Sequence, residues 1–585
     1  MILTGDQQAL VDAEDSLFAV ACPGAGKTRA MVARFLKRTA EEKRRGIALI
    51  SFTNAAVNEV RQRCGDRAEA LEAPHFVGTF DAFIHRFIVT PLYVKVYKQK
   101  PNYVQSWRDV PSTSFRLRDM GRTKDLEFNW FDFDPDGRAH LDLSRVPREF
   151  GDADAHRKIA ERKQEAEANA AYIFGRLLRA GTVSCAAARV LAEFWLGSAK
   201  ERVILAPLLR SRFAEVIVDE AQDCGREELR ILEFLRDCGV RVVLVGDIDQ
   251  SIYEFRSATP AAVQVFATSL PRLLELRDNW RSSPAICALN SALRSGPFAE
   301  TARGDNSIVQ TPVHLIEFSS LDQIVPAALD VAEQHKLAAA DLMLLSHAEV
   351  HGMKAAGVVS PESVGSSRVL AIASAGLKLR SRETDPKTRQ KAVDQVQRAV
   401  LAVLTVNQKT EHHSFDALCE QAGVERRWLE AFAVRMAMSL HAEPKAKQTF
   451  AAEVRDFMKR ADWGDVAPPS SGDLGKLFKA PSDEAWTSVA GFGNSPAIPF
   501  STVHGVKGME FPGVVLVLPE RLRVDRVTER TVLDDWEGGH DTEARRVLYV
   551  AASRAQQLLM CAVHRKHVAR VGALLDAKGV PYVKT

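Results

Sequence analysis

Residues 21–28, ACPGAGKT, have the composition of a loop that binds nucleotide phosphates. Backbone N–H groups of the loop and of a following helix would hold the phosphates, Lys27 would neutralise the β- and γ-phosphate charge, and Thr28 would ligate magnesium. Ala21 replaces the first glycine of the pattern, and Pro23 removes one backbone donor. A loop in which Ala21 has a negative φ tolerates both changes. An ordinary strand–turn–helix unit is the alternative interpretation.

A pair of acids follows another apolar run, in VIVDEAQD. Asp219 is predicted to bind magnesium, and Glu220 to orient and deprotonate an attacking water. A further run ends in VGDIDQSIYEFRSA, where Gln250 is placed to sense a γ-phosphate and Tyr253 and Phe255 follow closely. For the acid pair, an acidic turn at the surface is the alternative.

These groups need a framework that brings them together. Several runs rich in Val, Ile and Leu lack polar alternation, which is typical of parallel strands covered by helices on both faces. The runs lie at 16–22, 46–52, 213–220, 241–247 and 513–518. The pattern predicts an α/β fold. At 585 residues the chain is too long for one core, so we expect roughly three to five domains or subdomains.

Two long segments interrupt the α/β pattern. Residues 92–205 hold a charged, aromatic-containing stretch, FNWFDFDPDG, interpreted as a loop, and a helical stretch ended by Gly181. Residues 350–498 hold helical patterns and then APPSSGDLG, which is typical of a loop. Those helical patterns lie at 389–404, 426–440 and 450–461. We expect both segments to be mainly helical insertions.

Composition narrows the class of protein. Lys and Arg number 78 and Asp and Glu 75, so any nucleic acid must bind a local basic groove rather than a globally cationic protein. The eight cysteines form no C-x-x-C pair, which argues against a zinc ribbon, an iron–sulfur cluster or a disulfide framework. Neither a leader peptide nor an apolar membrane span is visible, so we expect a cytoplasmic protein that does not bind membranes.

Eight motifs, in order, resemble the set carried by superfamily 1 helicases of the UvrD/Rep/PcrA type. They are ACPGAGKT, ALISFTNAAVNEVRQR, VGTFDAFIHRF, VIVDEAQD, VGDIDQSIYEFRSA, LRDNWRSSPAI, STVHGVKGMEFPGV and RRVLYVAASRAQQL. They run from residue 3 to about 560 and leave only the two insertions unmatched. In that family an alanine at the first loop position is usual. The resemblance implies a DNA-stimulated ATPase that acts as a DNA helicase or translocase, moving 3′→5′ on single-stranded DNA.

The same resemblance implies two RecA-like P-loop lobes with parallel sheets, each carrying a mainly helical insertion. The first lobe is expected at 1–91 and 206–270, around an insertion at 92–205. The second lobe is expected at 271–349 and 499–585, around an insertion at 350–498.

The resemblance further implies that ATP, with Mg²⁺, lies between the lobes. Arg29 and Trp280 resemble the pair that sandwiches the base, with Trp280 in place of a more usual tyrosine. Gln7 resembles the residue that reads adenine, with Gln8 as the alternative register, and Glu510 resembles the ribose contact. The implied ATP-binding set is Gln7, Pro23, Gly24, Ala25, Gly26, Lys27, Thr28, Arg29, Trp280 and Glu510.

Two arginines of the second lobe, Arg281 and Arg554, resemble those that reach the γ-phosphate. Such arginines stabilise transition-state charge and make hydrolysis depend on closure of the lobes. The implied catalytic set is Lys27, Glu220, Gln250, Arg281 and Arg554, and the implied metal ligands are Thr28 and Asp219.

The strand-binding side is implied by the same motifs, because single-stranded DNA is held by aromatic platforms and backbone contacts. The implied DNA-binding set is Phe52, Asn54, Thr79, Tyr253, Phe255, Arg256, His504 and Lys507. The polar members resemble either phosphate contacts or groups that couple the lobes. For Phe52 and Phe80, a place in the core is the alternative.

The sequence departs from the family at several positions. Asp81 replaces a histidine and Ala55 a lysine, and both changes weaken the expected grip on phosphates. The second insertion lacks a clear G-G-x-x-F-x-x-R-x-E segment, so we expect reduced duplex-handling elements. We expect no RecB-like nuclease domain in this chain.

One stretch, GTFDAFIHRFIVTPL, resembles the helicase-like subunit GajB of Gabija anti-phage defence systems. That resemblance implies a GajA-like OLD/TOPRIM nuclease as partner. Two alternatives stay open. One is a stand-alone helicase of DNA repair or recombination. The other is a sensor of DNA ends that hydrolyses ATP without unwinding.

Overall fold

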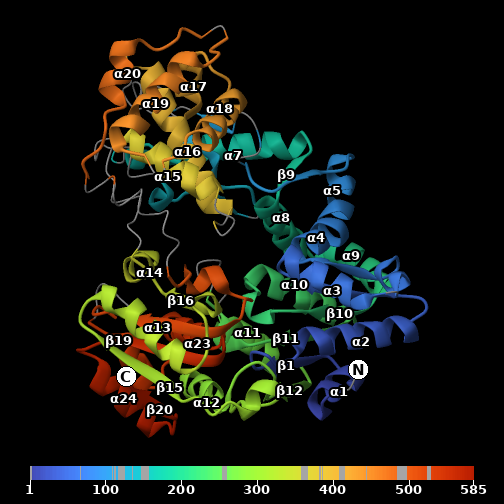
Figure 1. Cartoon of the computed structure of the whole chain (residues 1–585). Helices are drawn as coiled ribbons and strands as arrows, with labels where there is room; N and C mark the ends of the chain where they lie inside the picture. The colour runs from blue at the N-terminus through green and yellow to red at the C-terminus, as the bar shows by residue number, and fades with distance from the viewer. Residues whose placement is uncertain are drawn as a thin grey trace.

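The computed structural model has two α/β lobes side by side, below a helical region formed by the insertions (Figure 1). It describes residues 3–65, 67–107, 110, 113–115, 117, 126–134, 136–146, 157, 159–252, 260–357, 367–380, 384, 386–406, 415–442, 445–464, 466–483, 486, 497–522 and 529–585. Within these ranges no helix has the length and apolar character needed to cross a membrane.

The first lobe is built on a six-stranded sheet in which every neighbouring pair is parallel. Its strands, in spatial order, are β12 (Arg272–Leu276), β1 (Leu17–Ala21), β11 (Arg241–Gly246), β10 (Phe213–Val218), β2 (Gly46–Ser51) and β3 (Phe76–Thr79). The four apolar runs expected in this lobe are confirmed as strands. Because β12 pairs with β1, the expected boundary between residues 270 and 271 is wrong. The first lobe extends at least to Leu276.

Helices cover both faces of this sheet, which is why its inner strands are made mostly of apolar residues. One core is formed with α1 (Gly5–Asp12), α2 (Lys27–Glu41) and α3 (Asn54–Cys64). The opposite core is formed with α4 (Phe80–Phe83), α8 (Cys185–Gly197), α9 (Ala199–Arg212), α10 (Arg226–Asp237) and α11 (Pro260–Thr268).

The second lobe has its own six-stranded parallel sheet. Its strands, in spatial order, are β17 (Phe500–Thr502), β16 (Leu342–Ser346), β18 (Phe511–Leu518), β19 (Ala555–His564), β15 (Val313–Phe318) and β20 (Tyr582–Lys584). One face packs on α12 (Pro284–Leu293), α22 (Val532–Glu537), α23 (Glu543–Ala552) and α24 (Val568–Ala577), and the other on α13 (Ile324–Gln334) and α14 (Glu349–Ala355).

The first insertion leaves the first sheet after β3. A π-helix at Ile84–Val89 continues into α5 (Thr90–Tyr97), and α7 (Lys163–Arg179) lies further along the chain. The stretch expected to be a loop instead forms a hairpin, in which β7 (Phe131–Phe133) pairs antiparallel with β8 (Ala139–Leu141). Its turn contains Gly137 at φ +85°, and buried aromatic rings anchor its strands.

The second insertion lies between β16 and β17 and is helical. It contains α15 (Arg368–Arg380), α16 (Pro386–Leu404), α17 (Phe415–Ala422), α18 (Arg426–Ser439), α19 (Lys447–Arg460) and α20 (Ser471–Leu477). The three predicted helices are confirmed. The loop-like stretch APPSSGDLG was misinterpreted in part, because the Ser470 side chain accepts a hydrogen bond from the backbone of Asp473 and thereby caps α20.

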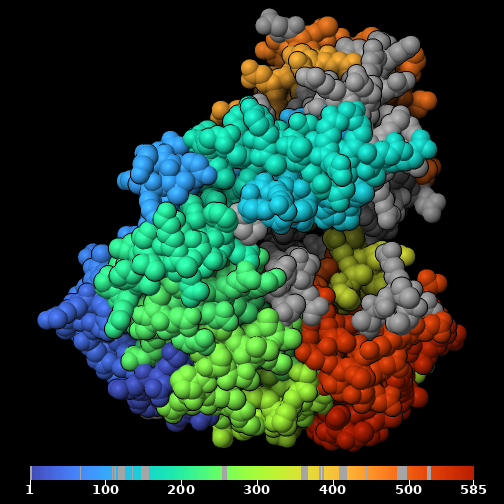
Figure 2. Space-filling view, turned by 180° about the vertical axis from the view of Figure 1, so that it is seen from behind, coloured from blue at the N-terminus to red at the C-terminus, as the bar shows by residue number. Residues whose placement is uncertain are grey.

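The two insertions form one region next to the lobes. The helices of the second insertion lie at the top in Figure 1, beside α7 of the first insertion. Figure 2, seen from behind, shows the same order, with the first insertion between the first lobe and the second insertion.

Candidate functional site

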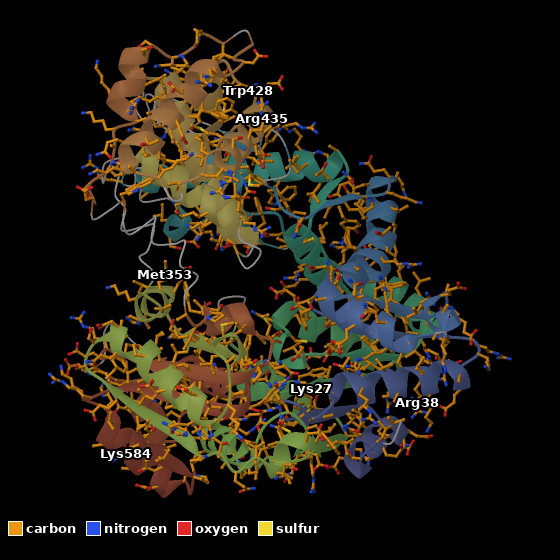
Figure 3. The ribbon with its side chains drawn as sticks, in the orientation of Figure 1. Lys27, Arg38, Met353, Trp428, Arg435 and Lys584 are labelled. Atoms are coloured by element: carbon orange, nitrogen blue, oxygen red, sulfur yellow. The ribbon has the colours of Figure 1, made fainter. Side chains whose placement is uncertain are left out.

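The phosphate-loop candidate joins β1 to α2, at the carboxyl end of a central strand. Gly24 and Gly26 have φ values of +71° and +70°, which side-chain-bearing residues rarely adopt. Lys27 and Thr28 begin α2, whose first N–H groups have no partner within the helix. Figure 3 shows Lys27 at the end of α2 nearest the second lobe. The loop therefore has the geometry of an anion-binding helix terminus.

One segment from later in the chain, residues 279–281, approaches the loop closely. The backbone N–H of Trp280 donates to the Gly24 carbonyl over 3.0 Å. A Cβ at Gly24 would lie 2.6 Å from both Cβ of Arg281 and Oδ1 of Asn279, so no larger residue fits there. The segment at 279–281 is thereby held against the loop.

The predicted choice between Gln7 and Gln8 has a geometric answer. Gln7 is buried, and its Nε2 donates to the Ala25 carbonyl over 2.8 Å. Its Oε1 accepts from the backbone of Thr4, which caps α1. Gln8 is exposed and donates to Asp12 instead. Only Gln7 lies beside the loop.

Asp219 and Glu220 follow β10, beside the loop. Asp219 is buried, and its Oδ1 accepts from the backbone N–H of Glu220 over 2.9 Å. Burial, and then the charge of Glu220, raise the pKa of Asp219 to about 7. Burial opposes ionisation of Glu220 too, but Lys27 and Lys507 outweigh it and lower its pKa to about 2. Nζ of Lys27 lies 3.8 Å from Oε2 of Glu220.

Gln250 and Arg554 meet across the boundary between the lobes. Gln250 lies in a short helix after β11, and Nη2 of Arg554 donates to its Oε1 over 3.2 Å. Arg554 precedes β19 and is fully buried, with Nη1 donating to the Met509 carbonyl. Burial, and then the neighbouring Arg281, lower the pKa of Arg554 to about 10. An anion placed between these arginines would relieve their repulsion.

Arg281 reaches the same region from the other side. Its Nε donates to Oε2 of Glu510 over 2.5 Å, and its Nη1 donates to the Ser553 carbonyl over 3.1 Å. The side chain of Glu510 is half exposed, immediately before β18. The predicted γ-phosphate and ribose contacts are thus brought together with the loop.

Trp280 offers an aromatic face beside the loop. It is 48% exposed, unusually open for a tryptophan, and its ring packs against Gly304. Arg29, its predicted partner in sandwiching the base, lies in the first turn of α2.

The donor set suits a nucleotide triphosphate with Mg²⁺. Loop N–H groups, Lys27 and two arginines supply positive charge for phosphates, while the Thr28 hydroxyl and the Asp219 carboxylate are oxygen ligands that Mg²⁺ prefers. The negative charge of Asp219, buried beside Glu220, is stabilised by a cation. The residues therefore fit both groups.

The candidate strand-binding residues of the first lobe follow β2 and β3. Phe52 is half-buried and stacks on Phe80, with ring centroids 5.7 Å apart. Phe80 is 1% exposed and belongs to the core, as its alternative interpretation predicts. Asn54 is exposed at the start of α3, and Thr79 caps α4 through its hydroxyl. Tyr253, Phe255 and Arg256 lie outside the described residues.

His504 and Lys507 contact the first lobe. Nε2 of His504 lies 3.1 Å from the Ile252 carbonyl oxygen. Nζ of Lys507 donates to both carboxylate oxygens of Asp223, over 2.7 and 2.9 Å. Of the two roles predicted for these residues, the geometry favours coupling between the lobes over a phosphate contact.

Asp81, the departure from the family pattern, has a structural partner. Its Oδ1 accepts from Nε and Nη2 of Arg189, over 3.0 and 2.9 Å. Arg189 belongs to α8 of the first insertion and also lies 3.5 Å from Glu228. The carboxylate thus ties the insertion to the lobe, which explains an acid at this position.

Sequence reasoning missed a buried polar set behind the site. Asn279 and Asp247 stand within two of the motifs, so their motif membership was a usable signal. Arg294 and Glu300 belong to no motif, and nothing in the sequence marks them. Tyr549, in RRVLYVAAS, completes the set.

Comparisons with known proteins find relatives of both lobes. A family model described as the UvrD/REP helicase N-terminal domain matches residues 3–271, and one described as the UvrD-like helicase C-terminal domain matches residues 481–566. Together these models cover more than half of the chain.

Individual relatives match only part of this chain. DNA helicase II of Escherichia coli strain K12 is 27% identical over 305 residues, and that of Salmonella typhimurium is 26% identical over 305. Each match covers 49% of this chain and 39% of the relative, so the chain spans about two fifths of their length. One component of the ATP-dependent helicase/nuclease of Streptococcus thermophilus is 36% identical over 105 residues, 16% of this chain and 8% of that protein.

Proposed function

We propose that this chain, which belongs to the UvrD/REP family of helicases, is an ATP-dependent motor that moves 3′→5′ on single-stranded DNA. One observation carries the proposal. Arg281 and Arg554 of the second lobe lie at the loop and acids of the first, with Arg554 donating to Gln250 across the boundary. Hydrolysis would then require both lobes, which is the condition for coupling it to movement.

The chemistry is divided among the residues of the site. Loop N–H groups and Lys27 bind and orient the phosphates, and Glu220 accepts a proton from the attacking water. Thr28 and Asp219 would hold Mg²⁺, which when bound would neutralise part of the phosphate charge. Arg281 and Arg554 stabilise the charge that develops on the γ-phosphate oxygens.

Movement would follow from the contacts that cross the boundary. Lys507 is paired with Asp223, immediately beyond the acid pair, and His504 contacts the backbone just beyond Gln250. A change at the γ-phosphate would therefore reach His504 and Lys507 of the second lobe through a short path. Phe52 would stack on a base of the DNA strand while the lobes shift.

ATP turnover with and without single-stranded DNA, measured beside strand displacement on tailed duplexes, tests this function. We expect DNA to stimulate turnover and a 3′-tailed duplex to be separated faster than a 5′-tailed one. Turnover without displacement on either substrate would favour the sensor of DNA ends. Absence of turnover would contradict the proposal.

For the biological setting, we propose a role in a Gabija-type defence complex with a TOPRIM-type nuclease. The stretch that carries this resemblance, residues 78–92, contains the end of β3, all of α4 and the π-helix, and the start of α5, next to the first insertion. Purification from the native host, followed by identification of co-eluting proteins, tests the partner. A stable complex with such a nuclease is expected, whereas an isolated chain with robust unwinding favours a repair or recombination helicase.

A further inference from the structure

A buried arginine links the two lobes behind the ATP site. Arg294 is the C-cap residue directly after α12 of the second lobe, and its side chain is 1% exposed. Its Nη1 and Nη2 donate to the two carboxylate oxygens of Asp247, each over 2.9 Å, and Nη1 also donates to Asp249. Asp247 directly follows β11 of the first sheet. The guanidinium carbon also lies over the rings of Phe298 and Tyr549, 4.3 and 4.7 Å from their centroids.

A buried carboxylate continues this link within the second lobe. Oε1 of Glu300 lies 3.1 Å from the Tyr549 hydroxyl, which lies 2.7 Å from Oδ2 of Asp247. Oε2 of Glu300 accepts from the side-chain amides of Asn279 and Asn290, over 2.8 and 3.1 Å. Every polar group in this sequence of contacts is inaccessible to water or nearly so.

Both ends of these contacts are groups already placed in the ATP site. At one end Nε2 of Gln250 donates to Oδ2 of Asp247 over 2.8 Å. At the other end Oδ1 of Asn279 accepts from the backbone N–H of Arg281 over 2.9 Å. We call this path the interlobe relay. Its groups, in order, are Gln250, Asp247 with Arg294, Tyr549, Glu300, Asn279 and Arg281.

We propose that Arg294 and Glu300 are positioning residues of the ATP site, which hold Gln250 and the segment of Trp280 and Arg281 in one fixed arrangement. The inference rests on the proposed function. It names the groups that make the two lobes of the protein act together. Arg294 acts on the γ-phosphate sensor through Asp247. Glu300 acts on the base platform and on Arg281 through Asn279.

Stability alone is a poor explanation for the relay. Buried ion pairs contribute little net stability compared with apolar groups of similar size, because desolvation offsets their attraction. Their directional bonds do fix which atoms face each other. A bidentate pair across a boundary therefore sets the register of the two lobes, as polar groups set register elsewhere.

The chain offers a matched control in a second buried arginine pair. Nε and Nη2 of Arg34 donate to the two carboxylate oxygens of Glu215, over 2.7 and 2.8 Å, and both side chains are fully buried. This pair lies entirely within the first lobe and contacts none of the ATP-site residues.

The experiment compares ATP turnover by the full chain with DNA present. Arg294→Lys keeps the charge but loses the bidentate pairing, and we expect kcat to fall about tenfold with little change in KM. Because Arg294 acts through Gln250, we expect the same substitution to lower kcat less than about twofold in a Gln250→Ala background. Arg34→Lys should lower the melting temperature and leave kcat and KM unchanged.

Glu300 is tested by a second pair of variants. Glu300→Met removes both acceptors, and we expect KM for ATP to rise about tenfold. Glu300→Gln can accept from Asn279 and donate to Tyr549, so we expect it to restore KM. Equal effects of Arg294→Lys in both backgrounds, or a Glu300→Met variant with a lower melting temperature and unchanged KM, would overturn the positioning role.

A binding measurement separates this inference from the proposed function. If the unmodified chain hydrolyses no ATP, the proposed function fails. The relay is then tested by the rise in melting temperature that ATPγS causes. We expect Glu300→Met to lose this rise and Arg34→Lys to keep it. An undiminished rise in Glu300→Met would contradict the relay.

Discussion

The two sheets have the same strand order but contribute opposite ends of their strands to the proposed ATP site. We number the strands of each sheet in chain order. Read from β12 to β3, the first sheet has the order sixth, first, fifth, fourth, second, third, and the second sheet has the same order when read from β20 to β17. In the first sheet the phosphate loop, the acid pair and Gln250 follow the carboxyl ends of strands. In the second sheet Glu510 and Arg554 stand immediately before β18 and β19, at the amino ends.

This difference shows how one scaffold serves two purposes. The carboxyl edge of a parallel sheet, with helix N-termini above it, is suited to bind phosphates. The amino edge of the second sheet instead supplies Arg554, which is buried and directly precedes β19. Its carboxyl edge is left for the segment of His504 and Lys507, after β17. The ATP site is therefore complete only where the two edges meet.

The largest expected effect breaks the phosphate-binding edge. Lys27→Ala should abolish ATP turnover, because it removes the positive charge at the start of α2 that neutralises the β- and γ-phosphates, and single-strand binding should persist. Turnover and DNA affinity are measured on the same preparation. Lys37→Ala, on the exposed face of the same helix, is the control that should keep turnover. Normal turnover in Lys27→Ala would refute the site.

Removing an arginine tests the opposite edge. Arg554→Ala should lower kcat about 10³-fold, since arginines that reach a γ-phosphate have effects of this order in related enzymes. ATP affinity should fall much less, because the loop still holds the phosphates. Single-turnover kinetics separate the two quantities. An affinity loss as large as the loss in kcat would mean that Arg554 only binds ATP.

The strand-binding edge of the first lobe is tested by Phe52→Ala. We expect single-stranded DNA to bind about tenfold more weakly, equivalent to ~1.4 kcal/mol, within the range for one stacked base. Fluorescence anisotropy with a labelled oligonucleotide measures this. Phe194→Ala, which removes an aromatic ring 46% exposed on α8, should leave affinity unchanged. Equal losses in both variants would remove Phe52 from the DNA path.

The smallest effect concerns the coupling between the edges. Lys507→Met should reduce the stimulation of ATP turnover by DNA about threefold, ~0.7 kcal/mol, with basal turnover nearly unchanged, because it breaks one partly buried ion pair. Lys566→Met, which breaks an exposed pair with Glu520, is the control. A weaker DNA affinity at unchanged stimulation would instead make Lys507 a phosphate contact.

Much of the fold followed from sequence because its signals are local. The apolar runs predicted β1, β2, β10, β11 and β18, since a strand buried on both faces is made mostly of apolar residues. The β7–β8 hairpin was missed because its acidic residues conceal short strands that tertiary packing of aromatic rings stabilises. The strand β12 was assigned to the wrong lobe, because the sequence of a strand does not specify which other strand it pairs with.

The sequence by itself determined which residues are candidates for binding phosphate and magnesium, because a phosphate loop or an acid pair is contiguous and its local geometry follows from a few neighbouring residues. Only the tertiary structure decided between Gln7 and Gln8, paired Lys507 with Asp223, and gave Asp81 its arginine. It also revealed Arg294 and Glu300, whose partners come from separate segments of the chain. A buried charge is defined by the groups that surround it, and those groups are assembled only when the chain folds.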